Sequence, residues 1–284
     1  MKISIITATY NSLQHLPDVI NSIGEQTYAN IEYIVIDGGS TDGTVEQLKQ
    51  SNLVSQIITE PDQGIYDALN KGIKMATGDI IGFLHSDDLF SSSETLQHIV
   101  DAFSTSSQKI QNSAFSLPSG EMSGVRHEGG RTERHGGGRE VASVVYGDLV
   151  FVDPHATNKV VRYWKSQPFK PELLKQGWMP PHPTVFMRRE VYQKHGLFNI
   201  NLKCAADYDY ILRVFQDPTL KIVYLPEVIT KMRMGGMSTG GFKNLINKKR
   251  EDYWVLKKNK MPFPLWILLA KNVSKIPQLF FRKR

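Results

Sequence analysis

The first hundred residues constrain the fold most, because short apolar runs alternate there with stretches of helical periodicity. Four runs rich in Ile and Val have the length of strands, and the segments between them place apolar residues on one helical face. The runs are residues 3–7, 34–37, 54–59 and 80–84. This alternation predicts an α/β fold, with a mostly parallel, Rossmann-like sheet flanked by helices on both faces.

Polar residues follow each of these runs. Ligands of parallel sheets bind beyond the carboxyl ends of the strands, so the residues at those ends carry functional information. They are Thr9, Tyr10 and Asn11, then Asp37, then Glu60 and Asp62, and finally Asp87 with Asp88. We interpret this edge as a ligand cleft, the alternative being a set of acidic turns.

The fourth run leads directly into two adjacent carboxylates, in the sequence FLHSDDLF of residues 83–90. Two like charges in such proximity repel each other unless a cation lies between them. One interpretation is a site for a hard cation, which prefers carboxylate oxygen. The other is a solvated turn before the next helix, because Ser91 and Glu94 have the spacing of a capping box.

Residues 35–48, VIDGGSTDGTVEQL, read as a strand, a glycine-rich turn and a capped helix. They match neither the dinucleotide-binding fingerprint nor the P-loop. Asp37 is placed to accept a hydrogen bond from a nucleobase imide or a ribose hydroxyl. Its alternative role is to stabilise the turn.

The remaining chain divides by composition. Residues 104–140 are rich in Gly, Ser and charge and predict a flexible low-complexity insertion. Beyond them we expect two antiparallel strands (144–153 and 158–164), two helices (188–195 and within 205–215) and a strand (221–228). We therefore divide the chain into residues 1–103, 104–140, 141–242 and a basic amphipathic tail, 243–284.

Composition narrows the location and the partners. A single cysteine, Cys204, forms no intramolecular disulfide, and we find neither a signal-peptide pattern nor about 18 apolar residues in succession, so we expect a cytoplasmic protein. Residues 243–284 hold 12 Lys and Arg against 2 Asp and Glu, whereas the other 242 residues hold 22 against 26. The basic excess lies in the tail, which argues against a nucleic-acid partner.

Several segments in order resemble the family 2 inverting glycosyltransferases of the GT-A fold, particularly the non-processive bacterial enzymes of surface-polysaccharide assembly. They are SIITATYN, VIDGGSTDGT, EPDQGIYDALNKGIKMATGDIIGFLHSDD, WMPPHPTVFMRREVYQKHGLFN and AADYDYILRV. The resemblance covers roughly residues 1–103 and 144–240. It implies that residues 1–103 bind a nucleotide-diphosphate sugar and that residues 141–242 form the acceptor-side half of the same domain.

The resemblance also implies roles for single residues. Asp37 would contact the nucleoside, and Asp87 with Asp88 would bind ribose and a Mn²⁺ or Mg²⁺ ion that bridges the two phosphates. The family pattern Asp-x-Asp-Asp has His85 at its first position here, so we expect Asp87 to carry the main coordination. We predict that the nucleotide sugar is bound by Thr7, Thr9, Asn11, Asp37, Asp62, Asp87, His182 and Arg233.

An inverting transfer needs a base for the acceptor hydroxyl, and a carboxylate within hydrogen-bond reach suffices. By resemblance this base is Asp207, while Asp209, which cannot face the same way on a helix, would be structural and pair with Arg213. The alternative role of Asp207 is a negative charge at a helix N-terminus, which the helix dipole favours. We interpret residues 231–241 as a loop that closes over the diphosphate or as a plain surface loop, and Trp178 as either an acceptor platform or a core residue.

In the tail, apolar residues stand beside cations, as in a segment lying at a membrane surface. We therefore expect peripheral contact with an anionic membrane at the inner face of the cell membrane; the alternative is a helix packed on the domain. Overall the sequence predicts transfer of a single sugar to a glycan or lipid-linked acceptor in the cell envelope. The rival functions are a catalytically weak nucleotide-sugar-binding module and a sugar nucleotidyltransferase.

Overall fold

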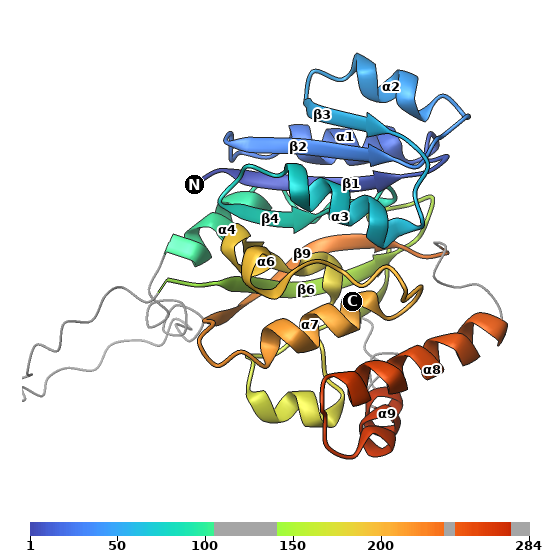
Figure 1. Ribbon diagram of the computed structural model, residues 1–284. Coiled ribbons are helices and arrows are strands. Elements are labelled where there is room, and N and C mark those ends of the chain that lie inside the picture. Colours follow the sequence, from blue (N-terminus) through green and yellow to red (C-terminus); the bar gives the residue numbers. More distant parts are fainter. Residues whose placement is uncertain (105–140, 236–241, 274–284) are drawn as a thin grey trace, which may run out of the picture.

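The computed structural model describes residues 1–104, 141–235 and 242–273 (Figure 1). Its first part contains four parallel strands in the order β3-β2-β1-β4, connected by helices. These elements are β1 (Ile3–Thr9), α1 (Leu16–Gly24), β2 (Ile31–Asp37), α2 (Thr44–Gln50), β3 (Val54–Thr59), α3 (Ile65–Met75) and β4 (Ile80–Phe83). The βαβ alternation predicted from the sequence is confirmed.

The second part extends the same sheet with mixed directions. It consists of β5 (Asp88–Phe90), α4 (Thr95–Ser104), β6 (Val144–Val152), β7 (Val160–Trp164), the 3₁₀ helices η1 (Pro171–Gln176) and η2 (His182–Thr184), β8 (Phe186–Arg188), α6 (Arg189–His195), α7 (Ala206–Phe215), β9 (Ile222–Arg233), α8 (Phe242–Lys258) and α9 (Pro264–Val273). The described sheet has the order β3-β2-β1-β4-β8-β6-β9-β5, with β7 beside β6. The predicted antiparallel pair is β6 and β7.

Helices cover both faces of the sheet. On one face α3, α6 and α7 pack over Ile6, Ile34 and Phe83, all essentially buried. On the other, α1, α2 and α4 pack over Ile5 and Val35. In Figure 1 the first four strands lie one below the other, with α3 in front of β4 and α1 behind. The predicted fold class, a sheet between two helical layers, is therefore confirmed.

The segment after the fourth strand differs from the capping-box interpretation. Asp88 lies in strand β5, where it pairs with Met232 of β9. Helix α4 begins only at Thr95, and the Ser91 hydroxyl bonds to the Val228 carbonyl instead of capping a helix with Glu94. A solvated turn is thus the wrong description for Asp88, because the long-range pairing with β9 makes this short segment a strand.

The last two described helices pack against the domain below α7 (Figure 1). Val255 and Leu256 of α8 and Ile267 of α9 belong to the same core as α7. No helix within the described ranges has the length and apolar character needed to cross a bilayer. Most of the predicted insertion (residues 105–140), the end of the predicted loop (236–241) and the last part of the basic tail (274–284) lie outside the described residues.

Candidate active site

The first polar cluster lies in the turn after β2 and is centred on Asp37, which is fully buried. Its Oδ1 accepts hydrogen bonds from the hydroxyls of Thr9, at 3.0 Å, and Ser40. Its Oδ2 accepts from the backbone N–H groups of Gly39, at 3.0 Å, and Ser40, at 2.9 Å. Both oxygens of Asp37 are therefore occupied by its own turn and by β1, as the turn-stabilising alternative requires.

Asn11 and Asp62 border this turn. Asn11 has a left-handed backbone (φ 48°), and its side-chain oxygen accepts from the Thr41 N–H at 2.9 Å. The Asp62 carboxylate accepts from the Gly64 N–H at 2.8 Å. Asp62 also lies so close to Gly38 that a Cβ there would be 2.6 Å from its Oδ2, so any larger residue would displace the Asp62 carboxylate. The strand ends of β1, β2 and β3 thus converge as predicted from their order.

Two hydrogen bonds connect this cluster to the segment that follows β4. The buried Thr7 hydroxyl donates to the Leu84 carbonyl at 2.6 Å, which joins β1 to the end of β4. The Ser12 hydroxyl donates to that of Ser86 at 3.1 Å. Thr7 therefore holds the strands in register from a fully buried position, and the loop after β1 lies next to the residues between His85 and Asp88.

Asp88 is as buried as Asp37, but neither of its carboxylate oxygens has a hydrogen-bond partner. Burial raises the pKa of Asp88 well above its usual value, and Asp87 adds to the rise, while Arg233 opposes it. Asp87 itself is half-buried. This segment therefore holds a carboxylate whose ionised form lacks compensation by hydrogen bonds.

Arg233 lies at the end of β9 and is nearly buried. Its guanidinium donates to the Asp87 carbonyl at 2.9 Å and forms an ion pair with Asp18 of α1. The sequence-based interpretation placed Arg233 in a loop, and this is wrong, since the residue ends a strand that pairs with both β5 and β6. Arg233 nevertheless lies beside the acidic pair, where we predicted a phosphate-binding residue.

A second cluster brings the acceptor-side half to the end of β4. The His85 and His182 rings are 6.2 Å apart, and His182 also packs against Phe83 at 5.4 Å. Burial lowers the pKa of His182 to about 4, although the Asp207 carboxylate opposes this shift. Burial likewise lowers the pKa of His85, against the opposing effects of Asp87 and Asp207. Both imidazoles are therefore neutral near pH 7, and both lie within the electrostatic range of Asp207.

Tyr66, at the start of α3, completes this cluster and was missed by the sequence reasoning. Burial raises the pKa of its hydroxyl, and the charge of Asp207 raises it further. The hydroxyl therefore stays protonated beside Asp207. Its position in the first turn of a helix after a strand end was the available signal, because that turn borders the ligand-binding edge.

Asp209 and Trp178 make contacts within the protein interior. Asp209 is fully buried, pairs with Arg213 at 3.2 Å as predicted, and accepts a hydrogen bond from Asn259 at 2.9 Å. It therefore points away from Asp207, toward α8. Trp178 is half-buried and packs against Tyr146 at 5.8 Å, which agrees with its interpretation as a core residue.

The acidic pair suits a cation that arrives together with phosphate. Within the part of the chain that the structure describes, no three His, Cys, Asp or Glu side chains form a ready metal centre. Mg²⁺, however, commonly takes only one or two carboxylates, with substrate phosphates and water as its other ligands. The unpartnered oxygens of Asp88 and the half-buried Asp87 fit such a shared ion.

Comparisons with known proteins find glycosyltransferases. Residues 4–112 match the family model described as glycosyl transferase family 2. A PGL/p-HBAD biosynthesis glycosyltransferase of Mycobacterium bovis BCG is 29% identical over 277 residues, which are 96% of this chain and 91% of the relative.

Two solved structures share the fold at low sequence identity. The crystal structure of S. aureus TarS 1-349 with UDP-GlcNAc is 17% identical, with a TM-score of 0.64; the match covers 91% of this chain but only 65% of that one. A mannosyltransferase from Pyrobaculum calidifontis, in complex with GDP-Man and Mn²⁺, is also 17% identical, with a TM-score of 0.59, over 98% of this chain and 70% of that one. The fold is therefore that of the GT-A glycosyltransferases. The match of residues 4–112 to glycosyl transferase family 2 agrees with the resemblance that the motifs had indicated.

Proposed function

We propose that this protein is an inverting glycosyltransferase that moves one sugar from a nucleotide-diphosphate donor to a glycan or lipid-linked acceptor. The observation that carries the proposal is the position of Asp207. About 120 residues separate Asp207 from the acidic pair in the sequence. Its charge nevertheless raises the pKa values of His85, His182 and Tyr66 at the carboxyl end of the parallel strands. A carboxylate beside the donor-binding edge is what a direct displacement needs.

In this mechanism Asp207 accepts the proton of the acceptor hydroxyl as the oxygen attacks the anomeric carbon. The bond between that carbon and the diphosphate oxygen breaks on the opposite side, so the configuration inverts. Tyr66 stays protonated beside the carboxylate, while the neutral rings of His85 and His182 line the pocket and can exchange hydrogen bonds with sugar hydroxyls. Asp37, Asp62, Thr9 and Asn11 shape the turn on which we place the nucleoside.

The leaving diphosphate requires charge compensation. Asp87 and Asp88 would hold Mn²⁺ or Mg²⁺, and the ion would neutralise charge on the departing phosphates. The mannosyltransferase structure with GDP-Man and Mn²⁺ supports this cofactor. Arg233, fixed to the Asp87 carbonyl, adds a guanidinium next to the same acids.

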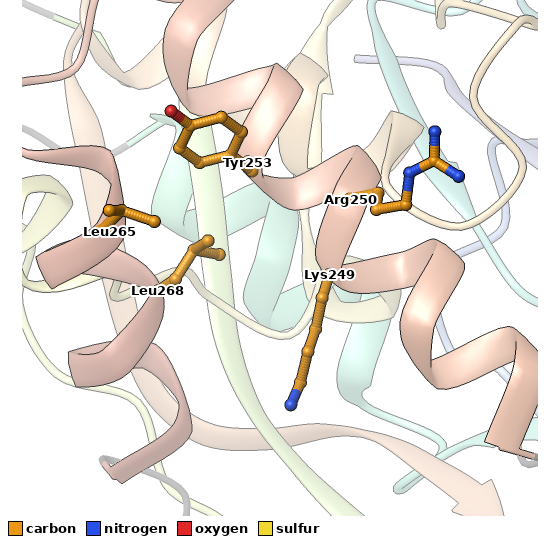
Figure 2. A pocket seen from close by; sticks show the side chains of 5 residues that line it. All are labelled: Lys249, Arg250, Tyr253, Leu265 and Leu268. Carbon is orange, nitrogen blue, oxygen red and sulfur yellow. The ribbon is translucent and has the colours of Figure 1, made fainter.

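We place the reaction in cell-envelope polysaccharide assembly, in the cytoplasm at the inner face of the membrane. The exposed surface of α8 and α9 supports membrane contact: four large apolar side chains there are 61 to 80% exposed, namely Phe263, Leu265, Trp266 and Leu269. A pocket of about 340 Å³ opens between the two helices, lined by Lys249, Arg250, Tyr253, Leu265 and Leu268 (Figure 2). Apolar anchors beside cations suit an anionic interface.

The structure also divides α9 into two sides. Ile267 is buried in the core, and buried Lys271 forms an ion pair with Asp252 at 3.0 Å. The helix thus packs on the domain, which was the alternative, and still presents apolar residues to solvent. Sedimentation with vesicles containing phosphatidylglycerol should recover the wild-type protein, and Trp266→Ser with Leu269→Ser should reduce recovery severalfold. Equal recovery of both proteins would contradict the proposed membrane contact.

The reaction itself is tested by release of nucleoside diphosphate from a panel of sugar nucleotides, with and without Mn²⁺. Wild-type protein should release it slowly without acceptor, and Asp207→Asn should lower the rate by about 10³-fold. Asp217→Asn is the matched control, because this carboxylate follows the same helix but pairs with Lys194 and His195, and its loss should keep most of the rate. A binding module without catalysis would bind a donor yet show no release, and a nucleotidyltransferase would instead need a sugar phosphate and a nucleoside triphosphate.

A further inference from the structure

Helix α7, which carries Asp207, begins without a cap of its own. Its N-cap residue is Ala205, which has no side chain that could accept a hydrogen bond. The backbone N–H groups at a helix start need acceptors from elsewhere when they are not solvated. The base is two residues beyond this uncapped position, so whatever holds this turn also determines where Asp207 lies.

Glu251 of α8 holds the turn that leads into this helix. Its Oε1 accepts from the Lys203 N–H at 3.1 Å, and its Oε2 accepts from the N–H groups of Cys204 at 2.7 Å and Ala205 at 3.0 Å. One carboxylate thus binds three successive backbone donors immediately before the catalytic helix. Bonds from N–H groups to an ionised carboxylate are stronger than neutral ones, and a negative charge at a helix N-terminus is favourable.

Two further contacts fix α7 to the C-terminal helices directly after Asp207. The neighbouring residue Asp252 pairs with Lys271 of α9, and the Lys271 ammonium lies 3.5 Å from the centre of the Tyr208 ring. At the other end of α8, Lys258 lies 3.2 Å from Asp209. The backbone around Asp207 is therefore held by α8 and α9, while its carboxylate accepts the Tyr208 N–H at 2.8 Å and acts electrostatically on Tyr66 and the two imidazoles.

We propose that Glu251 is a positioning residue for Asp207. By holding the turn of residues 203–205, its carboxylate directs the base toward the acceptor hydroxyl without touching the substrate. Burial and then Glu251 raise the pKa of the Cys204 thiol, with a smaller contribution from Asp207, so both carboxylates surround this one turn. The inference rests on the proposed role of Asp207 as base.

The test measures steady-state donor turnover and nucleoside diphosphate binding for Glu251→Ala, Glu251→Gln and Asp207→Asn, and for the double variant Glu251→Ala with Asp207→Asn. Glu251→Ala should lower kcat about tenfold or more, since small displacements of a catalytic group are costly, while KM and the Kd of the diphosphate change less than about twofold. Glu251→Gln keeps one carbonyl acceptor, so its kcat should lie between those of Glu251→Ala and wild type. It also carries the test if the alanine variant does not fold.

The double variant distinguishes positioning from a general structural effect. If Glu251 acts through Asp207, its removal should not slow the Asp207→Asn protein further. Glu32→Gln is the matched control. Glu32 also accepts a backbone N–H, from Thr77 at 2.8 Å, but it is buried at the opposite end of the strands, so its loss should affect stability and leave kcat unchanged.

An unchanged kcat in Glu251→Ala would overturn the inference, and so would an equal fold loss in the wild-type and Asp207→Asn backgrounds, or a loss of diphosphate binding as large as the loss of kcat. These results differ from failure of the proposed function itself. In that case wild-type protein would turn over no sugar nucleotide, or Asp207→Asn would be fully active.

Discussion

Asp37 and Asp88 are both completely buried aspartates near strand ends, yet their surroundings are opposite. Asp37 receives four hydrogen bonds, two from hydroxyls and two from backbone N–H groups of its own turn. Asp88 receives none at its carboxylate. The difference shows that burial alone does not identify the role of an acid. The satisfied carboxylate builds the frame, and the unsatisfied one is available for a ligand that brings positive charge.

Glu32 extends the comparison to the opposite end of the strands and gives the largest expected effect on stability. Burial alone would raise the pKa of Glu32, but hydrogen bonds from Lys2, Ser4 and Thr77 outweigh it and lower the pKa to about 2. The unfolded chain has the ordinary value, near 4.5. The resulting stabilisation, on the order of 3 kcal/mol, is present above about pH 4.5 and is lost as the pH falls through 2.

Urea unfolding of wild type and Glu32→Gln from pH 7 down to pH 3 measures this term. The wild-type free energy of unfolding should fall more steeply with acid than that of the variant, because the amide has no proton to gain. Parallel curves would show that Glu32 is not a satisfied carboxylate of this kind.

The next effect comes from Asp37→Asn. An amide can accept at one oxygen only, so about two of the four hydrogen bonds are lost and the free energy of unfolding at pH 7 should fall by about 2 kcal/mol. Chemical denaturation without ligands gives the value. A variant as stable as wild type would mean that the turn does not depend on this carboxylate.

Asp88→Asn has the smallest expected effect, and its sign is opposite. The change removes a buried acid that has no hydrogen bonds, so the metal-free protein should gain about 1 kcal/mol in the same experiment. Destabilisation comparable to that of Asp37→Asn would show that the two aspartates do not differ in their contribution to stability. Adding Mn²⁺ with UDP or GDP should stabilise wild type more than this variant.

Much of the fold could be predicted from the sequence, because β1 to β4 are apolar runs separated by stretches of helical periodicity. β5 and β8 could not, since three residues are too short to show a period. Their strand conformation depends on pairing with β9 and with β4 and β6, which are distant along the chain. Arg233 was misplaced for the same reason, because glycines after it suggested a loop while pairing extends β9 through it.

Candidate residues of the site could be predicted from the sequence at the strand ends and in the motif around Asp207. The functional roles assigned to them stay predictions. The hydrogen-bond partners of each residue could not be predicted. Nothing in the local sequence of Asp37 and Asp88 distinguishes four hydrogen bonds from none. Tyr66 lies about 140 residues before Asp207 in the sequence, and Glu251 lies 44 residues after it. Only the packing of α3, α7 and α8 brings them together.

The most direct test is calorimetric titration of UDP and GDP into wild type, Asp87→Asn and the control Asp217→Asn, each with and without Mn²⁺. If the acidic pair holds a cation shared with the diphosphate, Mn²⁺ should tighten binding of the preferred nucleotide at least about tenfold in wild type and Asp217→Asn, and should have little effect in Asp87→Asn. Equal affinity with and without Mn²⁺ in wild type, or the same enhancement in Asp87→Asn, would contradict this account.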